Sequence, residues 1–502
     1  MVAQHHSAPD GSEGAVEGVI KIPNHKFQML NKFQISKLKT TLTLLVVASF
    51  IFIYIPVQAS AKQILAQSGV TYLGYYDVPN ELGGGSGIIW GQGFTHRYVN
   101  GQLRFLTFTF MGNDVDASHQ FKLVEFALPS SFGSAITSIT NSWVDINNGA
   151  ANYQGKHVGI WWDEPKQRLW TTSAIDYPGD SDVTTKAIYT RTLNSDGTVS
   201  NLKGAIGLLG INSRRIYGGA QAVPTWFQQQ YGVGPYMVGW GGYASRAAAG
   251  GLISLGPTAY IIPDPSSFAN NTDIPAGQFK TLMDYSSGMT TQDWYAQGAP
   301  TTFDRGVRNS DVINYFDGGD TRQNPSTPPT GPPQAGAQWL SPAPDGLGRW
   351  IWGDSNYNTG MWIETANKLG FMTVPSLGCG MAYYGGSTLH TERRCFEFQV
   401  FDPANFGEAI QGNRQPWNVK PSSRWVITLP GMGVGTSGNG PSNNVAGATY
   451  DPTAQRVYVY GFYAYGTYPN NFGNRIYVYQ VNDQTPPPDT TPPAPPTGLK
   501  VR

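Results

Sequence analysis

The feature that most constrains the fold of this chain is a short repeated pattern. The pattern is a glycine, an apolar run, an acidic turn, then a basic or polar residue and a second apolar run. Residues 159–170 (GIWWDEPKQRLW) and 447–458 (GATYDPTAQRVY) match position for position without a gap, and looser copies begin at Gly93 and Gly360. Each copy predicts a strand, a tight turn and a returning strand. An Asp suits the turn because its side chain bonds the backbone two residues further on.

A second element follows the hairpins along the chain: an alternating strand that often ends in Asp or Pro. We interpret these segments as the outer strands of five units, at 121–129, 187–193, 258–265, 395–403 and 475–483. Their wide spacing predicts long loops, or a sixth unit hidden between residues 284 and 350. Because that interval is rich in Pro and Gly, we interpret it mainly as an insertion. Five units are therefore favoured, with six or seven left open.

These units predict an all-β chain folded as a β-propeller. Charged residues make up only 13% of the chain, and it holds 61 Gly and 36 Pro, which suits short strands joined by turns better than long helices. A unit of four short strands cannot bury both faces alone, but radial stacking of units does so. The strand at 72–79 is expected to close the ring by pairing within the last blade. A pair of β-sandwiches is the alternative architecture.

Four segments also carry a family resemblance: YLGYYDVP at 72–79, PTWFQQQYGVG at 224–234, FEFQVFDPANF to QPWNVKP at 396–421, and GATYDPTAQRVYVY to IYVYQV at 447–481. Together they resemble a family of exported bacterial β-propeller proteins that are often followed by fibronectin type III modules. The resemblance covers most of residues 70–483 and rests on structural motifs. It implies the propeller fold and export. Since the family has no assigned activity, it implies no functional residues.

The sequence predicts three regions. Residues 1–61 form a leader and signal peptide, because lysines precede an uncharged apolar stretch that ends in Ala59-Ser60-Ala61. Residues 62–483 form the propeller. Residues 484–502 form a Pro-rich linker and the start of a truncated fibronectin type III module. The mature protein is therefore expected to be secreted, extracellular or at the cell surface. The alternative is a retained membrane anchor, and a membrane is a partner only if this segment stays uncleaved.

Cysteine usage agrees with export. Cys379 and Cys395 are the only cysteines, and in an oxidising compartment they are expected to form a disulfide between two strands of one hairpin. The alternative is a pair of buried free thiols. The 33 basic and 33 acidic residues leave no surplus of positive charge, so no nucleic-acid partner is expected.

No metal site is predicted, since the chain lacks Cys-x-x-Cys and His-x-x-x-His spacings. No cofactor is expected either, although three acidic loops leave a structural calcium ion open. These loops contain Asp114 with Asp116, Asp176 with Asp180 and Asp182, and Asp317 with Asp320.

The predicted function is that of a secreted binding or scaffold propeller that recognises a surface glycan or protein. Aromatic rings with a polar edge stack on sugars and on protein partners, and basic side chains contact acidic groups. The candidate binding residues are Trp161, Trp162, Trp226, Trp240, Tyr243, His96, Arg97, Arg214 and Arg215.

The alternative is a carbohydrate-active enzyme, a glycoside hydrolase or polysaccharide lyase, so the sequence leaves open whether the protein is an enzyme. A hydrolase needs two facing carboxylates, and a lyase needs a His or Tyr base beside an Arg. The candidate carboxylates are Asp114, Asp116, Glu164, Asp354 and Glu364. The candidate lyase groups are His96 with Arg97, Arg214 and Arg215 with Tyr217, and His390 with Arg393 and Arg394.

Overall fold

A computed structural model describes most of the chain between residues 62 and 483. The described ranges are 62–79, 92–108, 122–145, 156–174, 184–216, 218–241, 256–285, 339–340, 357–385, 388–427, 429–432, 444–467 and 470–483. The predicted leader and signal peptide (1–61) and the Pro-rich linker (484–502) lie outside these ranges. No helix within the described ranges has the length and apolar character needed to cross a bilayer.

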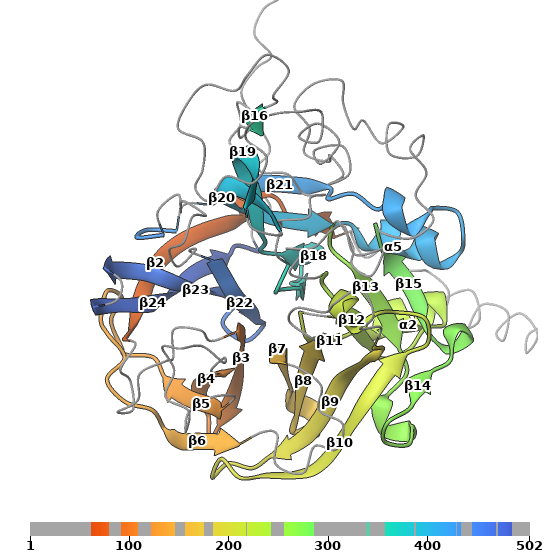
Figure 1. The fold of residues 1–502 in the computed structure, drawn as a ribbon, viewed down its shortest axis with the longest axis horizontal. Helices are drawn as coiled ribbons and strands as arrows, with labels where there is room; N and C mark the ends of the chain where they lie inside the picture. The colour runs from red at the N-terminus through yellow and green to blue at the C-terminus, as the bar shows by residue number, and fades with distance from the viewer. Residues whose placement is uncertain are drawn as a thin grey trace, which may run out of the picture. The chain divides into compact units, whose positions relative to one another are not determined.

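The described residues form five sheets arranged as the blades of a β-propeller (Figure 1). The predicted fold class is thus confirmed, and so is the favoured number of five blades. The first blade contains β3 (Gln92–Val99), β4 (Gln102–Phe108), β5 (Lys122–Ala127) and β6 (Asn141–Asp145). The second contains β7 (Lys156–Asp163), β8 (Arg168–Ala174), β9 (Lys186–Leu193) and β10 (Val199–Leu208), with β14 (Asp273–Ile274) paired parallel to β10.

The other three blades carry the insertions. The third contains β11 (Ala220–Ala222), β12 (Tyr236–Gly239), β13 (Ala259–Ile262) and β15 (Lys280–Met283), with helix α2 (Thr225–Tyr231) between its first two strands. The fourth contains β17 (Met361–Glu364), β18 (Lys368–Thr373), β20 (Thr388–Phe401) and β21 (Ser423–Val426), extended by β1 (Gln63–Ile64), β19 (Ser376–Gly385) and β16 (Trp339–Leu340), and helix α5 (Pro403–Ile410) follows β20. The fifth contains β22 (Asn444–Asp451), β23 (Arg456–Thr467), β24 (Asn470–Val481) and β2 (Val70–Pro79).

The innermost strands form a closed ring. β3 contacts β7, β7 contacts β11, β11 contacts β17, β17 contacts β22, and β22 contacts β3 again. Contacts between β22 and β3 advance in step, from Gly447 beside Phe94 to Asp451 bonded to Tyr98, so the two strands run in the same direction.

The ring is closed by the first long strand, as the sequence predicts. β2 is the outermost strand of the fifth blade and pairs antiparallel with β24 over its whole length, for example Tyr76 with Ile476. The two ends of the propeller thereby share one sheet, so the ring cannot open without breaking a complete strand pairing.

The four predicted repeat copies are the inner hairpins of the first, second, fourth and fifth blades: β3–β4, β7–β8, β17–β18 and β22–β23. The third blade lacks the repeat, because helix α2 stands between its first two strands, β11 and β12, in place of a tight turn. The interpretation of the second element as outer strands is wrong. β5, β9, β13, β20 and β24 are the third strands of their blades, since β6, β10, β15, β21 and β2 lie outside them.

The glycine that opens the repeat is explained by crowding at the ring of inner strands. A Cβ on Gly159 would lie 2.1 Å from the backbone nitrogen of Gly219 in the third blade. A Cβ on Gly447 would lie 2.5 Å from the backbone nitrogen of Phe94 in the first blade. Adjacent inner strands approach so closely at these points that only glycine fits.

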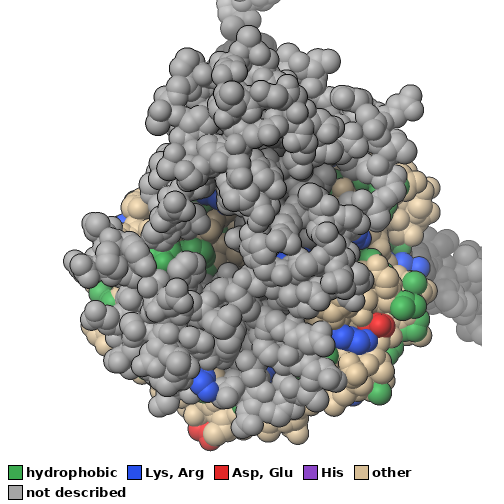
Figure 2. Space-filling view, viewed as in Figure 1, with side chains coloured by type: hydrophobic (Ala, Val, Ile, Leu, Met, Phe, Trp, Pro, Cys, Tyr) green, Lys and Arg blue, Asp and Glu red, His purple; other side chains and the backbone are tan. Residues whose placement is uncertain are grey.

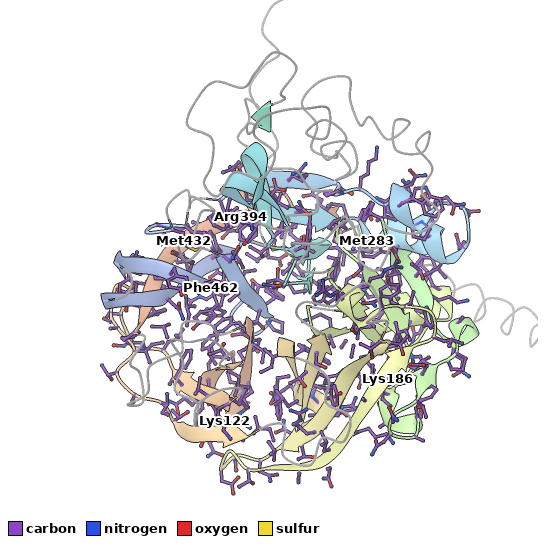
Figure 3. The ribbon with its side chains drawn as sticks, in the orientation of Figure 1. Lys122, Lys186, Met283, Arg394, Met432 and Phe462 are labelled. Carbon is purple, nitrogen blue, oxygen red and sulfur yellow. The ribbon has the colours of Figure 1, made fainter. Side chains whose placement is uncertain are left out.

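The cores lie between neighbouring blades, and each sheet is buried on both faces. Two residues labelled in Figure 3 show this for the fifth blade: Met432, in the turn after β21, and Phe462, in β23, belong to different cores. Met432 packs in the core that the fifth blade shares with the fourth, whose members include Phe398 and Val400. Phe462 packs in the core shared with the first blade, which includes Phe94 and Phe105. Apolar burial on two faces explains why the strands read as nearly continuous apolar and aromatic runs.

Candidate binding groove between the fourth and fifth blades

Arg97, a candidate binding residue, forms a buried ion pair at the junction of the first and second blades. Its Nε and Nη2 donate to the two carboxylate oxygens of Glu125 at 2.7 and 2.8 Å, and both side chains are only 2% exposed. Its Nη1 donates to the backbone carbonyls of Leu193 and Asn194 at 3.2 and 3.0 Å. The guanidinium therefore serves to join two blades.

His96, the neighbouring candidate, lies half-buried between the first and fifth blades. Its Nδ1 lies 2.8 Å from Oγ1 of Thr449. Burial lowers the pKa of His96, and the opposing effect of the Asp451 and Glu164 carboxylates is smaller. The imidazole is thus a neutral hydrogen-bonding group near neutral pH.

The candidate tryptophans also take part in blade packing. Trp162 is buried, and the Arg97 guanidinium lies over it, with Cζ 5.4 Å from the centroid of the indole ring. The indole N–H of Trp162 donates to Glu164. Trp161 packs half-buried against Trp170 and Tyr236. The remaining two also lie in a core: Trp240 is 1% exposed, and Trp226 packs half-buried against the same group of side chains.

Arg214 and Arg215 are buried in a short 3₁₀ turn that precedes the third blade. Arg215 donates to Asp284 at 2.8 Å, and the Tyr260 hydroxyl donates to the same carboxylate at 2.7 Å. The other candidates lie outside what the structure describes: Tyr243, Tyr217, Asp114, Asp116 and Asp354, together with the side chains of His390 and Arg393. The structure therefore brings the described candidates together in blade junctions, not around one cavity.

The acidic position of the repeat has a specific use that the sequence analysis missed. Asp163 accepts a 2.8 Å hydrogen bond from the Tyr236 hydroxyl of the next blade. At the equivalent position Asp451 accepts a 2.8 Å bond from the Tyr98 hydroxyl of the first blade. Burial, helped by these carboxylates, raises the pKa of Tyr98 and of Tyr236 to about 12. In these two hairpins the acidic residue thus links the hairpin to the next blade as well as forming the turn.

The candidate carboxylates Glu164 and Glu364 have partners of the same kind. Glu364 bonds Lys62 at 2.7 Å and the Trp226 indole at 3.2 Å, while Glu164 accepts from the Trp162 indole. These bonds use oxygens that a hydrolase would direct at a sugar. Among the described residues no group of three or more His, Cys, Asp and Glu side chains is placed to hold a metal ion. The three acidic loops proposed for calcium lie in the part of the chain that the structure does not describe.

Cys395 is disulfide-bonded, and Cys379 is the only other cysteine of the chain. The two residues belong to β20 and β19, which pair as an antiparallel hairpin with Leu377 opposite Cys395 and Cys379 opposite Arg393. Cys379 and Cys395 therefore lie on two paired strands of one hairpin, two positions out of direct register.

A groove of about 280 Å³ lies where the fourth blade meets the fifth. The fourth blade supplies wall residues from β20 and β21 and from the turn that follows, and the fifth supplies wall residues from β2 and β24. Its wall is made of four aromatic residues (Tyr72, Phe398, Trp425, Tyr479), four aliphatic ones (Val70, Val426, Ile427, Pro430) and the amide residue Gln67.

The aromatic rings of the groove form one connected group. The Tyr479 ring lies 5.3 Å from that of Tyr72 and 4.9 Å from that of Phe398, which in turn lies 5.5 Å from Trp425. Tyr72 and Val426 are each 40% exposed, a large fraction for apolar side chains on β-strands. Their exposed surface is the part of this group that a ligand can cover.

Tyr479 gives the groove a polar group without a protein partner. Its side chain is 4% exposed, and its hydroxyl has no hydrogen-bond partner among the described residues. Burial raises the pKa of Tyr479 far above its usual value, so the hydroxyl keeps its proton and is a donor. A buried polar group left unpaired costs about 1–3 kcal/mol, which a ligand acceptor would recover once the side chains that cover the hydroxyl move aside.

One wall of the groove is held firmly. The carbonyl of Pro430 accepts from Arg475 Nη1 at 2.8 Å and from the Tyr477 hydroxyl at 2.9 Å. Arg475 is itself fixed by Asp77 at 2.6 Å and lies over the Tyr75 ring, 4.0 Å from its centroid. This part of the wall is therefore fixed before a ligand binds.

The chemistry of the groove suits an uncharged ligand with apolar faces. None of its nine described wall residues is charged, so these residues offer no partner for a phosphate, a uronate or an ammonium group. On the face seen in Figure 2, the described Lys and Arg side chains lie in small separate groups.

Sequence reasoning did not find this groove. The aromatic residues of 72–79 and those at alternate positions of 396–400 and 475–481 were a signal, but only the fold brings them together.

Comparison with known proteins adds solved structures of low similarity. A member of the DUF4221 family from Bacteroides vulgatus has 6% identity, covers 83% of this chain and 99% of its own, and gives a TM-score of 0.34. The PQQ domain of a pyranose dehydrogenase from Coprinopsis cinerea has 10% identity, coverage of 83% and 98%, and a TM-score of 0.32. A family AA12 carbohydrate-active enzyme from Trichoderma reesei has 10% identity, coverage of 85% and 99%, and a TM-score of 0.27. No protein-family model and no curated protein matches the chain.

Proposed function

We propose that this protein is an exported binding propeller whose groove between the fourth and fifth blades binds an extended, proline-rich polypeptide segment of a surface protein. The observation that carries the proposal is the uncharged aromatic groove with the unpaired Tyr479 hydroxyl in its wall. Aromatic-lined grooves of this kind suit the polyproline II helix, which is already extended and loses little entropy on binding.

Hydrogen-bond chemistry favours a polypeptide over a glycan in this groove. Proline has no N–H, so a proline-rich segment presents mainly carbonyl acceptors. The groove offers donors to match, from the hydroxyl of Tyr479 and the side-chain amide of Gln67. A sugar presents both donors and acceptors around its ring, and its recognition usually needs several polar side chains. With one amide and no carboxylate in its wall, the groove meets that need poorly.

The test is fluorescence anisotropy with labelled proline-rich peptides, in parallel with a glycan array. Tyr479→Phe keeps the ring and removes only the donor, so peptide affinity is expected to fall about fivefold, as for one hydrogen bond of about 1 kcal/mol. Tyr450→Phe is the matched control. Tyr450 is also a buried tyrosine of the fifth blade with an unpaired hydroxyl, but it does not line the groove.

Binding to glycans alone, weakened by Tyr479→Phe, would replace the polypeptide with a glycan as the ligand. No binding to either class would leave the groove without the proposed function.

A further inference from the structure

The chain leaves the propeller next to this groove. β24 ends at Val481, which pairs with Val70, a residue of the groove wall. Beyond the strand, the Asn482 amide donates to the carbonyl of Gly69 at 2.8 Å. The Asp483 carboxylate then accepts from the Asn367 amide of the fourth blade at 2.8 Å. The backbone is thus held against both blades that border the groove until residue 483.

The segment that follows has the composition that the groove suits. Residues 485–497 read TPPPDTTPPAPPT, with seven prolines and one charged residue, Asp489. Such a segment favours the polyproline II conformation, which rises about 3.1 Å per residue, so these thirteen residues reach about 40 Å. This length is ample to turn back from residue 483 and cover a groove whose wall begins at the neighbouring strand.

We propose that the proline-rich segment 485–497 binds in the groove of its own chain and competes there with the external ligand. The inference rests on the proposed function, since it assumes that the groove accepts a polyproline II segment. The Tyr479 hydroxyl donates to a carbonyl of the segment, and prolines cover the exposed ring of Tyr72. Tethering raises the effective concentration of the segment to the millimolar range, so weak contacts suffice to fill the groove.

The experiment uses the full chain in two forms. One form is wild type, and the other carries alanine in place of the seven prolines at 486–488, 492–493 and 495–496. A labelled peptide with the sequence of residues 485–497 is titrated into each and followed by fluorescence anisotropy. The seven-alanine form is expected to bind the peptide at least tenfold more tightly, because its own tail no longer fills the groove.

Two substitutions in the seven-alanine form locate the binding. Tyr72→Ala removes the exposed ring and is expected to weaken peptide binding about tenfold. Leu209→Ala is the matched control, because Leu209 is 54% exposed, directly follows β10 in the second blade and does not line the groove. Its substitution is expected to leave binding unchanged. Equal losses from both substitutions would overturn the assignment to the groove.

The outcomes separate the inference from the proposed function. If the tail peptide fails to bind the seven-alanine form, or binds both forms equally, the inference is wrong. If unrelated proline-rich peptides then still bind, the proposed function stands without it. If the tail peptide binds the seven-alanine form more tightly but no unrelated peptide binds, the inference stands and the proposed external ligand is wrong.

Discussion

Removing Arg97 tests whether the candidate basic residues hold the fold or contact a ligand. The guanidinium makes two short bonds to Glu125 and two to backbone carbonyls of the second blade, and neither side chain of the pair is more than 2% exposed. Arg97→Met keeps much of the side-chain volume but removes the cation that bonds both oxygens of Glu125, leaving Arg104 at 4.0 Å as the remaining cation. The Asn141 amide remains a neutral partner of Glu125.

Breaking a buried pair from one side costs about 3–5 kcal/mol, because the remaining charge loses most of its compensation, here all but the longer contact with Arg104. We therefore expect Arg97→Met to reduce the free energy of unfolding by about 4 kcal/mol, a factor of roughly a thousand in the folding equilibrium. Adding Glu125→Gln to Arg97→Met removes the stranded charge, so the double variant is expected to recover at least about 1 kcal/mol of this loss.

The assay is urea unfolding followed by tryptophan fluorescence, with the free energy obtained by linear extrapolation. Arg414→Met serves as a control, since the Arg414–Glu408 pair has the same 2.7 Å separation but side chains that are 32% and 46% exposed. Its loss is expected to cost less than about 1 kcal/mol. The reasoning is refuted if Arg97→Met costs as little as this control, or if Glu125→Gln recovers nothing.

Two further predictions concern the inner ring and the blade junctions. Gly159→Ala places a methyl group 2.1 Å from the backbone of Gly219, so it is expected to destabilise the propeller by about 3 kcal/mol or more in urea unfolding, whereas Gly277→Ala, with open space around its Cβ, is expected to change little. Burial by itself raises the pKa of Asp264, but hydrogen bonds from Arg168 and Lys166 outweigh it and hold that pKa well below its usual value. The stability from Asp264 is therefore present above about pH 4 and lost as the pH falls further, so Asp264→Asn should make the urea midpoint fall less between pH 5 and pH 2.5, and an unchanged fall would contradict this assignment.

Much of the fold followed from local patterns. Repeated hairpins, alternating strands and a low content of charged residues are consequences of short twisted strands stacked face to face, so they are visible in the sequence itself. The pairing of β2 with β24 was predictable for the same reason, because a ring needs its first and last strands in one blade. The order of strands within a blade was not, since neighbouring blades cover both faces of each sheet and the third and outer strands therefore have similar apolar patterns.

The candidate sites show the limit of residue types as evidence. Arg97, Trp162 and Arg215 have side chains that ligands often need, yet the structure uses them to join blades. Buried charges need partners, and these come from the same blade, as Glu125 does for Arg97, and from the adjacent blade, as the Leu193 and Asn194 carbonyls do. Sequence spacing says nothing about which blade faces which side chain.

The sequence by itself determined the class of fold, the hairpin repeats and the strand that closes the ring, because these depend on periodicity along the chain. Only the tertiary structure decided where a ligand can bind. The groove joins Tyr72 from the first long strand, Trp425 from the fourth blade and Tyr479 from the last strand, and packing leaves one hydroxyl there without a partner. Such a site arises where two sheets meet, so its residues share a surface without sharing a sequence motif.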